Sequence, residues 1–212
     1  MYRHKKTWVF TLLILSFSLL IFISENILLT EDHYYEFYGN QLSLERIESM
    51  IKLREKWSWM AYPLLPIIYL LKFSILSTWI LIGVIFFGYR ASFKQIFQMV
   101  IVSEFVFLIP SFIKVIWFGL IDMDYTLTDL SYFTPLSLAN FFDLPSIDPW
   151  WVYPLQSINV FEGIYVVVLA VGIKQVLKRN YRESLKFTLP VYGSGLLTWI
   201  IFITFLTLNF SS

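Results

Sequence analysis

The feature that most constrains this chain is a series of long apolar stretches, each close to the length of a helix that crosses a bilayer. A spanning helix needs about 20 mostly apolar residues, because only a helix satisfies its own backbone hydrogen bonds in lipid. Only 15% of the residues are charged, which leaves too little polar surface for a water-soluble fold. We therefore expect one all-α membrane domain over residues 1–212, with spans at about 7–24, 67–87, 97–120, 154–173 and 187–208.

The first apolar stretch follows Arg3, Lys5 and Lys6 and so resembles a secretory signal peptide. Its apolar region is longer than the roughly 7–15 residues of a signal peptide, and no small-residue cleavage site follows it. We interpret it as a retained membrane anchor.

The second apolar block runs from 57 to 89 and is interrupted by Lys72. It is too long for one untilted crossing and too short for two crossings with a turn. Pro63 and Pro66 predict an irregular or interfacial start ahead of the span at 67–87.

The basic residues predict the orientation of the bundle, because short cytoplasmic loops are enriched in lysine and arginine. With a cytoplasmic N-terminus and an outer C-terminus, the outer segments 25–56 and 121–153 hold four basic residues, namely Arg46, Lys52, Arg54 and Lys56. The inner segments then hold ten, namely Arg3, Lys5, Lys6, Arg90, Lys94, Lys174, Lys178, Arg179, Arg182 and Lys186. The inverted orientation fails this rule.

Two segments outside the predicted spans carry helical or aromatic patterns. Leu44, Ile47, Met50 and Ile51 recur at helical spacing, which predicts an amphipathic helix on the outer leaflet or against the bundle. A short helix is expected over 134–142. The aromatic residues that follow are predicted to anchor the chain at the membrane surface, a ligand-binding aromatic cage being the alternative: Trp150, Trp151 and Tyr153.

Ionisable residues inside the predicted spans are candidates for function, because an unpaired charge in lipid costs several kcal/mol. At their estimated depths, Lys72, Lys114 and Glu162 form a polar cluster facing the outer leaflet. Asn159, three residues before Glu162, lies on the same helix face and joins them. Glu104 lies in the inner half, with no intramembrane cation at its depth.

These residues admit more than one interpretation. Both lysines can extend to the outer headgroups while Glu162 pairs with one of them in a structural role. A conduction path, or a site for a lipid headgroup or small solute, is the alternative. Glu104 either faces an inner cavity, stays protonated or hydrogen-bonds a partner such as Ser103 or another subunit, and a proton-coupled carrier would need such a group.

The sequence offers no catalytic, metal or cofactor signature. It has no cysteine, and its two histidines, His4 and His33, are predicted on opposite sides of the membrane. No catalytic Gly-x-Ser-x-Gly, His-Glu-x-x-His or phosphate-binding loop occurs. Gly193-Ser-Gly195 predicts close helix packing by small residues. The net charge of +1 gives no reason to expect nucleic-acid binding.

From about 91 to 202, the order of features resembles the Yip family of small polytopic membrane proteins, which includes Rab-GTPase-interacting Golgi proteins and bacterial members. The stretches that carry the resemblance are Ala-Ser-Phe-Lys-Gln-Ile-Phe (91–97), Leu-Ile-Pro (108–110), Pro-Leu-Ser-Leu-Ala-Asn-Phe-Phe (135–142), Ser-Ile-Asn-Val-Phe-Glu (157–162) and Val-Gly-Ile (171–173). The resemblance implies five spans and a membrane scaffold or assembly factor without catalytic residues.

The sequence therefore favours a non-enzymatic accessory, scaffold or assembly subunit that contacts membrane lipids and a membrane-protein partner or a second copy of itself. The alternative is a small transporter or channel that uses Lys72, Glu104, Lys114 and Glu162. An intramembrane enzyme is the third hypothesis. The absence of cysteine and of appended domains favours a bacterial cytoplasmic membrane.

Overall fold

The computed structural model describes the backbone of residues 5–210 and the side chains of residues 8–210. Over that range the chain is all α, and five helical stretches are long and apolar enough to cross a membrane, which confirms the predicted fold class. They are Trp8–Leu28, Ala61–Phe86, Phe93–Ile121, Val160–Leu177 and Tyr181–Phe210. Arg3 and His4 lie outside the described residues, as do the side chains of Lys5 and Lys6.

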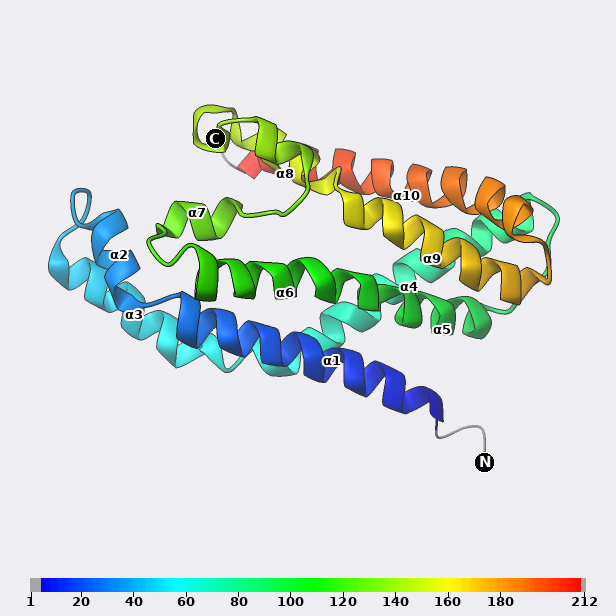
Figure 1. Ribbon diagram of the computed structural model, residues 1–212, viewed down its shortest axis with the longest axis horizontal. Helices are drawn as coiled ribbons and strands as arrows, with labels where there is room; N and C mark the ends of the chain where they lie inside the picture. Colours follow the sequence, from blue (N-terminus) through cyan, green and yellow to red (C-terminus); the bar gives the residue numbers. More distant parts are fainter. Residues whose placement is uncertain (1–4, 211–212) are drawn as a thin grey trace.

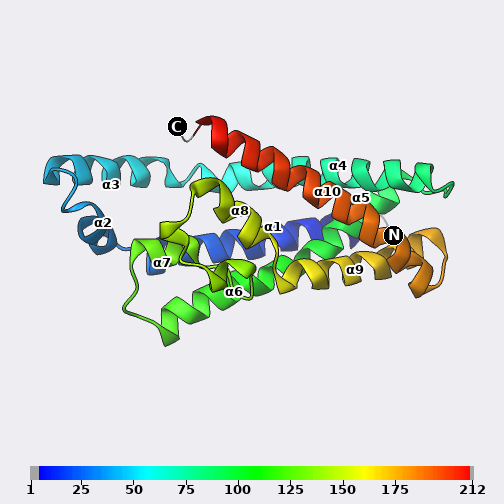
Figure 2. The same cartoon turned by 90° about the horizontal axis from the view of Figure 1, so that it is seen from above.

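The five stretches lie side by side along the long axis of the molecule (Figures 1 and 2). The start of the first span and the turns that join the second to the third span and the fourth to the fifth lie at one end, here named the short-loop end (Figure 1). The other end, here named the capped end, carries the end of the fifth span and the helices outside the spans (Figure 1). The two predicted outer segments therefore lie at one end of the bundle.

The first two spans begin and end away from their predicted limits. Helix α1 (Lys5–Ile23) continues through a π-helical turn, η1 (Ser24–Leu28), so the first span extends four residues past 24. Helix α4 (Ala61–Phe86) is helical from its first turn, with Pro63 near its start and Pro66 inside it. The predicted irregular start is wrong: Pro63 lies in the first turn, where a proline loses no hydrogen bond, and Pro66 removes one donor without ending the helix.

Two helices of the capped end precede α4. Helix α2 (Glu31–Tyr38) was not predicted, whereas α3 (Leu44–Ser58) confirms the predicted amphipathic helix. Ile47 and Ile51 are buried, and Leu44 is exposed. In both views α3 leads into α4 along the long axis and does not cross the end of the bundle (Figures 1 and 2).

The third span is not one regular helix. It consists of α5 (Phe93–Ser103), a 3₁₀ segment η2 (Glu104–Phe107), α6 (Leu108–Ile116) and a π-helical turn η3 (Trp117–Ile121). Pro110 lacks an N–H and so offers no donor to the carbonyl of Val106, four residues earlier. The interruption places Glu104 where the α-helical hydrogen-bond pattern changes.

Between the third and fourth spans, the chain builds most of the capped end. Helix α7 (Leu127–Tyr132) is followed by two 3₁₀ turns, η4 (Leu138–Phe141) and η5 (Leu144–Ser146), the first of which lies within the helix predicted over 134–142. Helix α8 (Pro149–Ser157) is separate from α9 (Val160–Leu177). The fourth span predicted at 154–173 thus begins six residues too early.

The helices next to the short-loop end have clear capping residues. Gly88 adopts a φ of +72° after α4, a conformation that favours glycine. Ser92 and Gln95 form a capping box at the start of α5. The side chain of Asn180 accepts a hydrogen bond from the N–H of Glu183, which caps α10 (Tyr181–Phe210).

The main core lies where α1, α4, α5, α9 and α10 meet, and most of it is in the half of the bundle toward the short-loop end. Because lipid is as apolar as these side chains, their burial gains little from leaving lipid. The core stabilises the bundle instead through close van der Waals packing. The fully buried apolar members of this core are Leu13, Phe73, Val84, Ile96, Val100 and Leu169.

Small residues allow α4 and α10 to approach closely. A Cβ atom added to Gly195 would lie 2.9 Å from the Trp79 ring, and one added to Gly83 would lie 2.7 Å from both methyl groups of Val191. A Cβ added to Gly193 would meet nothing within 4 Å. The close packing predicted for Gly193-Ser-Gly195 is therefore confirmed at Gly195 and wrong at Gly193.

Candidate functional site

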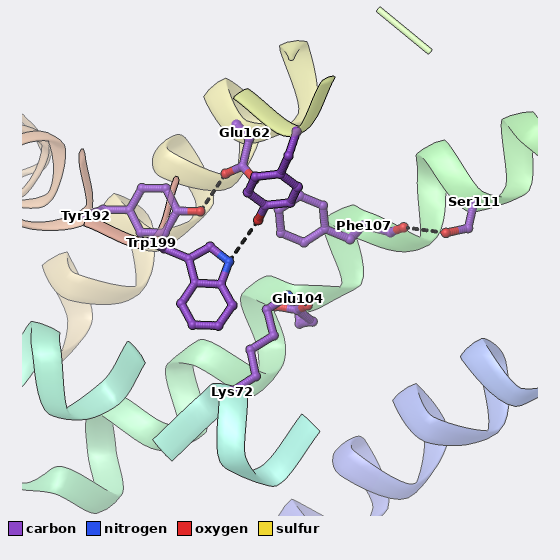
Figure 3. A network of polar contacts seen from close by, with 8 residues as sticks. Lys72, Glu104, Phe107, Ser111, Glu162, Tyr192 and Trp199 are labelled. Carbon is purple, nitrogen blue, oxygen red and sulfur yellow. Dashed lines mark hydrogen bonds and ion pairs between the residues drawn. The ribbon is translucent and has the colours of Figure 1, made fainter. Parts of the chain in front are cut away.

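An ion pair between Lys72 on α4 and Glu104 on η2 lies near the middle of the bundle (Figure 3). The Lys72 Nζ atom donates to Oε1 of Glu104 at 2.5 Å. The prediction that Glu104 has no cation at its depth is therefore wrong. Lys72 lies eleven residues after Ala61, and Glu104 lies eleven residues after Phe93. Both residues are about three helical turns inside spans that begin earlier than predicted.

The two partners of this ion pair differ in exposure. The Glu104 side chain is completely buried, whereas that of Lys72 is 49% exposed. The Lys72 ammonium also lies over two aromatic rings, 5.1 Å from the centroid of Phe107 and 5.7 Å from that of Tyr69. Ring faces attract cations, so these contacts partly compensate for the loss of water around the ammonium.

A second carboxylate, that of Glu162, lies in the first turn of α9. The Tyr192 hydroxyl on α10 donates to its Oε2 atom at 2.5 Å (Figure 3). Asn159 accepts a hydrogen bond from the backbone N–H of Glu162 at 2.9 Å and so caps the helix. Asn159 thus joins Glu162, as the sequence predicted, but through the backbone of Glu162 and not through its carboxylate.

Tyr165 packs between Phe107 of η2 and Tyr192 of α10, and the sequence did not single it out. Its ring contacts those of Phe107 and Tyr192, with centroids 4.9 and 5.2 Å away. Phe107 follows Glu104 by three residues and Tyr192 bonds Glu162, so Tyr165 packs next to the surroundings of both carboxylates. Tyr165 follows Glu162 by three residues, a spacing that places both on one helix face and could have identified it.

We name the resulting row of five side chains the polar chain: Lys72, Glu104, Tyr165, Tyr192 and Glu162. It joins α4, η2, α9 and α10, and it contains two carboxyl groups and one ammonium group. Two buried atoms in it, Oε2 of Glu104 and the Tyr165 hydroxyl oxygen, have no hydrogen-bond partner among the described residues. A buried polar atom without a partner costs free energy comparable to a lost hydrogen bond.

Lys114 does not join the polar chain. Its Nζ atom donates to the backbone carbonyl of Leu130 on α7 at 2.6 Å, and it takes part in no ion pair within residues 8–210. The predicted cluster of Lys72, Lys114 and Glu162 thus divides between two places. Lys114 instead lines a pocket of about 310 Å³ between α1 and α6.

The predicted membrane-surface anchors lie together on α8. The rings of Trp150 and Trp151 are 4.5 Å apart, and Trp151 is 47% exposed. Tyr153 instead accepts a hydrogen bond at 2.8 Å from the indole of Trp199 on α10. Tyr153 therefore ties α8 to the fifth span, a contact that the sequence analysis did not predict.

A second pocket, of about 420 Å³, lies between α1, α5 and α9. Its polar lining comes from three glutamines and a serine: Gln95, Gln98, Gln175 and Ser103. Ser103 immediately precedes Glu104, yet neither pocket is lined by Lys72, Glu104 or Glu162. Within residues 5–210, no three histidine, aspartate or glutamate side chains come together as a metal site would require.

The five apolar stretches and the polar chain between them define an α-helical, multi-pass integral membrane protein. Comparison with family models, curated proteins and solved structures finds no match to this chain.

Proposed function

We propose that this chain is a non-enzymatic accessory, scaffold or assembly subunit that binds another membrane protein through the face of α4 that carries Lys72. The observation that carries the proposal is the position of Lys72, which lies near the middle of a 26-residue span with half of its side chain exposed. Exposing a charged side chain to lipid at that depth is costly. A neighbouring helix with a polar acceptor would remove that cost.

The residues around Lys72 suit a helix-packing surface. Ile68, Leu71 and Ile75 lie one turn before, next to and one turn after Lys72, and each is more than half exposed. Apolar side chains at these spacings form the ridges that pack into the grooves of a neighbouring helix. A polar side chain among them adds a hydrogen bond that helps to hold two transmembrane helices together.

Site-specific photocrosslinking in the native membrane tests this proposal. A photoreactive residue at Leu71 should give a crosslinked product with a membrane protein, and the Lys72→Met/Glu104→Gln double variant, which leaves no unpaired buried charge, should lose most of it. The matched control is a photoreactive residue at Leu15 on α1, which is equally exposed (62% against 60% for Leu71) but lies away from any charge. Recovery of an uncrosslinked, folded monomer from both positions would contradict the proposal, and a crosslink to a second copy would identify the partner as the chain itself.

We also propose that the N-terminus is cytoplasmic, as the basic residues predict, and that the protein lies in a bacterial cytoplasmic membrane. The resemblance to the Yip family remains a prediction, and it agrees with a scaffold role. Membrane lipids are expected to cover the apolar faces that the partner leaves free.

A small proton-linked carrier is the second candidate function. It is favoured by the polar chain, which holds two carboxyl groups against one ammonium and leaves Oε2 of Glu104 and the Tyr165 hydroxyl without partners. Such a row of titratable groups resembles the proton relays of transporters. The interruption of the third span at Glu104 also resembles the discontinuous helices of transporters.

Proton flux into liposomes that contain the purified protein tests this second function. Under an imposed membrane potential, a carrier should lower the pH inside the liposomes, which an enclosed pH-sensitive dye reports. Glu104→Gln and Glu162→Gln should each abolish this proton flux. Glu183→Gln is the matched control, because Glu183 lies outside the polar chain at the short-loop end. Equal flux in all four proteins, or none above empty liposomes, would rule out proton conduction through the polar chain.

A further inference from the structure

The pocket between α1 and α6, named here the seam pocket, is polar at one end and apolar at the other. Its volume is about 310 Å³. The lining residues are Phe17, Leu20, Ile21, Ser24, Glu25, Ser111 and Lys114. Along α1 they pass from apolar to polar toward the capped end, and Lys114 likewise lies closer to that end than Ser111.

Two opposite charges line this pocket without pairing with each other. Glu25 and Lys114 form no ion pair, within the part of the chain whose side chains are described. Lys114 uses one N–H to bond the carbonyl of Leu130, and an ammonium group has three donors. A molecule with both a cationic and an anionic group could therefore bind both residues at once.

The backbone beside Glu25 is held from outside the pocket. Arg54 on α3 donates to the carbonyls of Glu25 and Leu29, at 2.7 and 3.4 Å. The Tyr125 hydroxyl donates to the carbonyl of Leu28 at 2.7 Å. Burial raises the pKa of the Tyr125 phenol, so it keeps the proton that this bond needs.

A small cluster of buried side chains completes this support. Leu28, Phe118, Tyr125 and Leu130 pack together at the capped end, next to the carbonyl that holds Lys114. The Lys114 ammonium and the backbone that carries Glu25 are thus attached to a packed frame. The Lys114 ammonium and the backbone of Glu25 therefore need not be ordered when a ligand binds, which lowers the entropic cost of binding.

We propose that the seam pocket binds a zwitterionic phospholipid whose headgroup carries a primary amine. Glu25 accepts hydrogen bonds from the ammonium group, Lys114 donates to the phosphate, and Phe17, Leu20 and Ile21 contact the start of an acyl chain. Both contacts are hydrogen bonds between charged groups, which are the strong class. This proposal does not depend on the proposed function.

Native mass spectrometry of the full chain in detergent tests the lipid preference. The probes are phosphatidylethanolamine, phosphatidylglycerol, phosphatidylcholine and soluble phosphoethanolamine. Phosphatidylethanolamine should bind about tenfold more tightly than phosphatidylglycerol, which lacks the amine, and than phosphatidylcholine, whose methylated amine donates no hydrogen bond. Soluble phosphoethanolamine should bind weakly, because it lacks the acyl chain that Phe17 and Leu20 contact.

Two variants assign the preference to the pocket. Glu25→Gln should abolish the preference for phosphatidylethanolamine, and Lys114→Gln, which keeps a donor for Leu130, should weaken the binding of all three phospholipids. Glu31→Gln on α2 is the matched control, and gel filtration of each variant reports folding. Equal binding of all phospholipids, or a preference unchanged by both variants, would overturn the proposal. Phosphoethanolamine binding as tightly as the lipid, with the same dependence on Glu25, would assign the pocket to the free zwitterion.

Discussion

Replacing Lys72 by methionine is expected to destabilise the protein by about 3 kcal/mol, the low end of the range for removing one partner of a buried ion pair. The low end applies because the Lys72 side chain is half exposed, whereas Glu104 is completely buried. The variant leaves the Glu104 carboxylate without its cation in a place from which water is excluded. Thermal unfolding of the purified protein in detergent, followed by loss of the monodisperse gel-filtration peak, measures the effect.

The double variant separates loss of the pair from loss of packing. Adding Glu104→Gln to Lys72→Met removes the unpaired charge and should restore most of the lost stability, because a neutral amide costs much less to bury than an unpaired carboxylate. Lys52→Met is the control, since the Lys52–Glu48 pair on α3 is exposed and such pairs contribute little. Additive losses in the double variant would show that Lys72 and Glu104 act independently.

The sequence was sufficient to predict the five crossings, because each apolar stretch is long and nearly free of charge. It was less informative about where each helix begins. Pro63 and Pro66 indicated a late start for the second span, yet proline near a helix N-terminus is compatible with a regular helix. The break between α8 and α9 was also missed, because the apolar residues at the end of Pro149–Ser157 resemble the beginning of the fourth span.

These boundary errors explain why the polar site was predicted incorrectly. Lys72 was placed about one and a half turns inside its span and lies about three turns inside. That difference moves it from the predicted cluster with Lys114 to the carboxylate of Glu104. Intramembrane charges pair when they lie at the same depth. An error of six residues in the start of the second span therefore changes the predicted partner of Lys72.

Composition does not show which tyrosines join the polar chain. Tyr165 and Tyr192 lie among 13 tyrosines, most of which are compatible with a membrane-surface position. Only the packing of α9 on α10 brings their rings together and directs the Tyr192 hydroxyl to Glu162. The sequence did indicate that Asn159 lies next to Glu162, because the three-residue spacing is local and needs no tertiary contact, but it did not indicate that Asn159 caps the helix.

Labelling of single cysteines should show an all-or-none difference between the two ends of the bundle. The chain has no cysteine of its own, so each introduced thiol reports one position. Asp124→Cys lies at the capped end and Arg90→Cys in the turn between α4 and α5, and both native side chains are exposed. A membrane-impermeant maleimide should label residue 124 in intact cells and residue 90 only after permeabilisation.

The physical reason for this expectation is the distribution of basic residues. Four lie in the predicted outer segments and ten in the inner ones, and this asymmetry sets orientation during insertion. Ile201→Cys, whose native side chain is 61% exposed on the fifth span, is the control and should stay unlabelled in both conditions. The reverse pattern at residues 90 and 124 would overturn the orientation and move the seam pocket to the cytoplasmic leaflet, while leaving the five crossings and the polar chain unchanged.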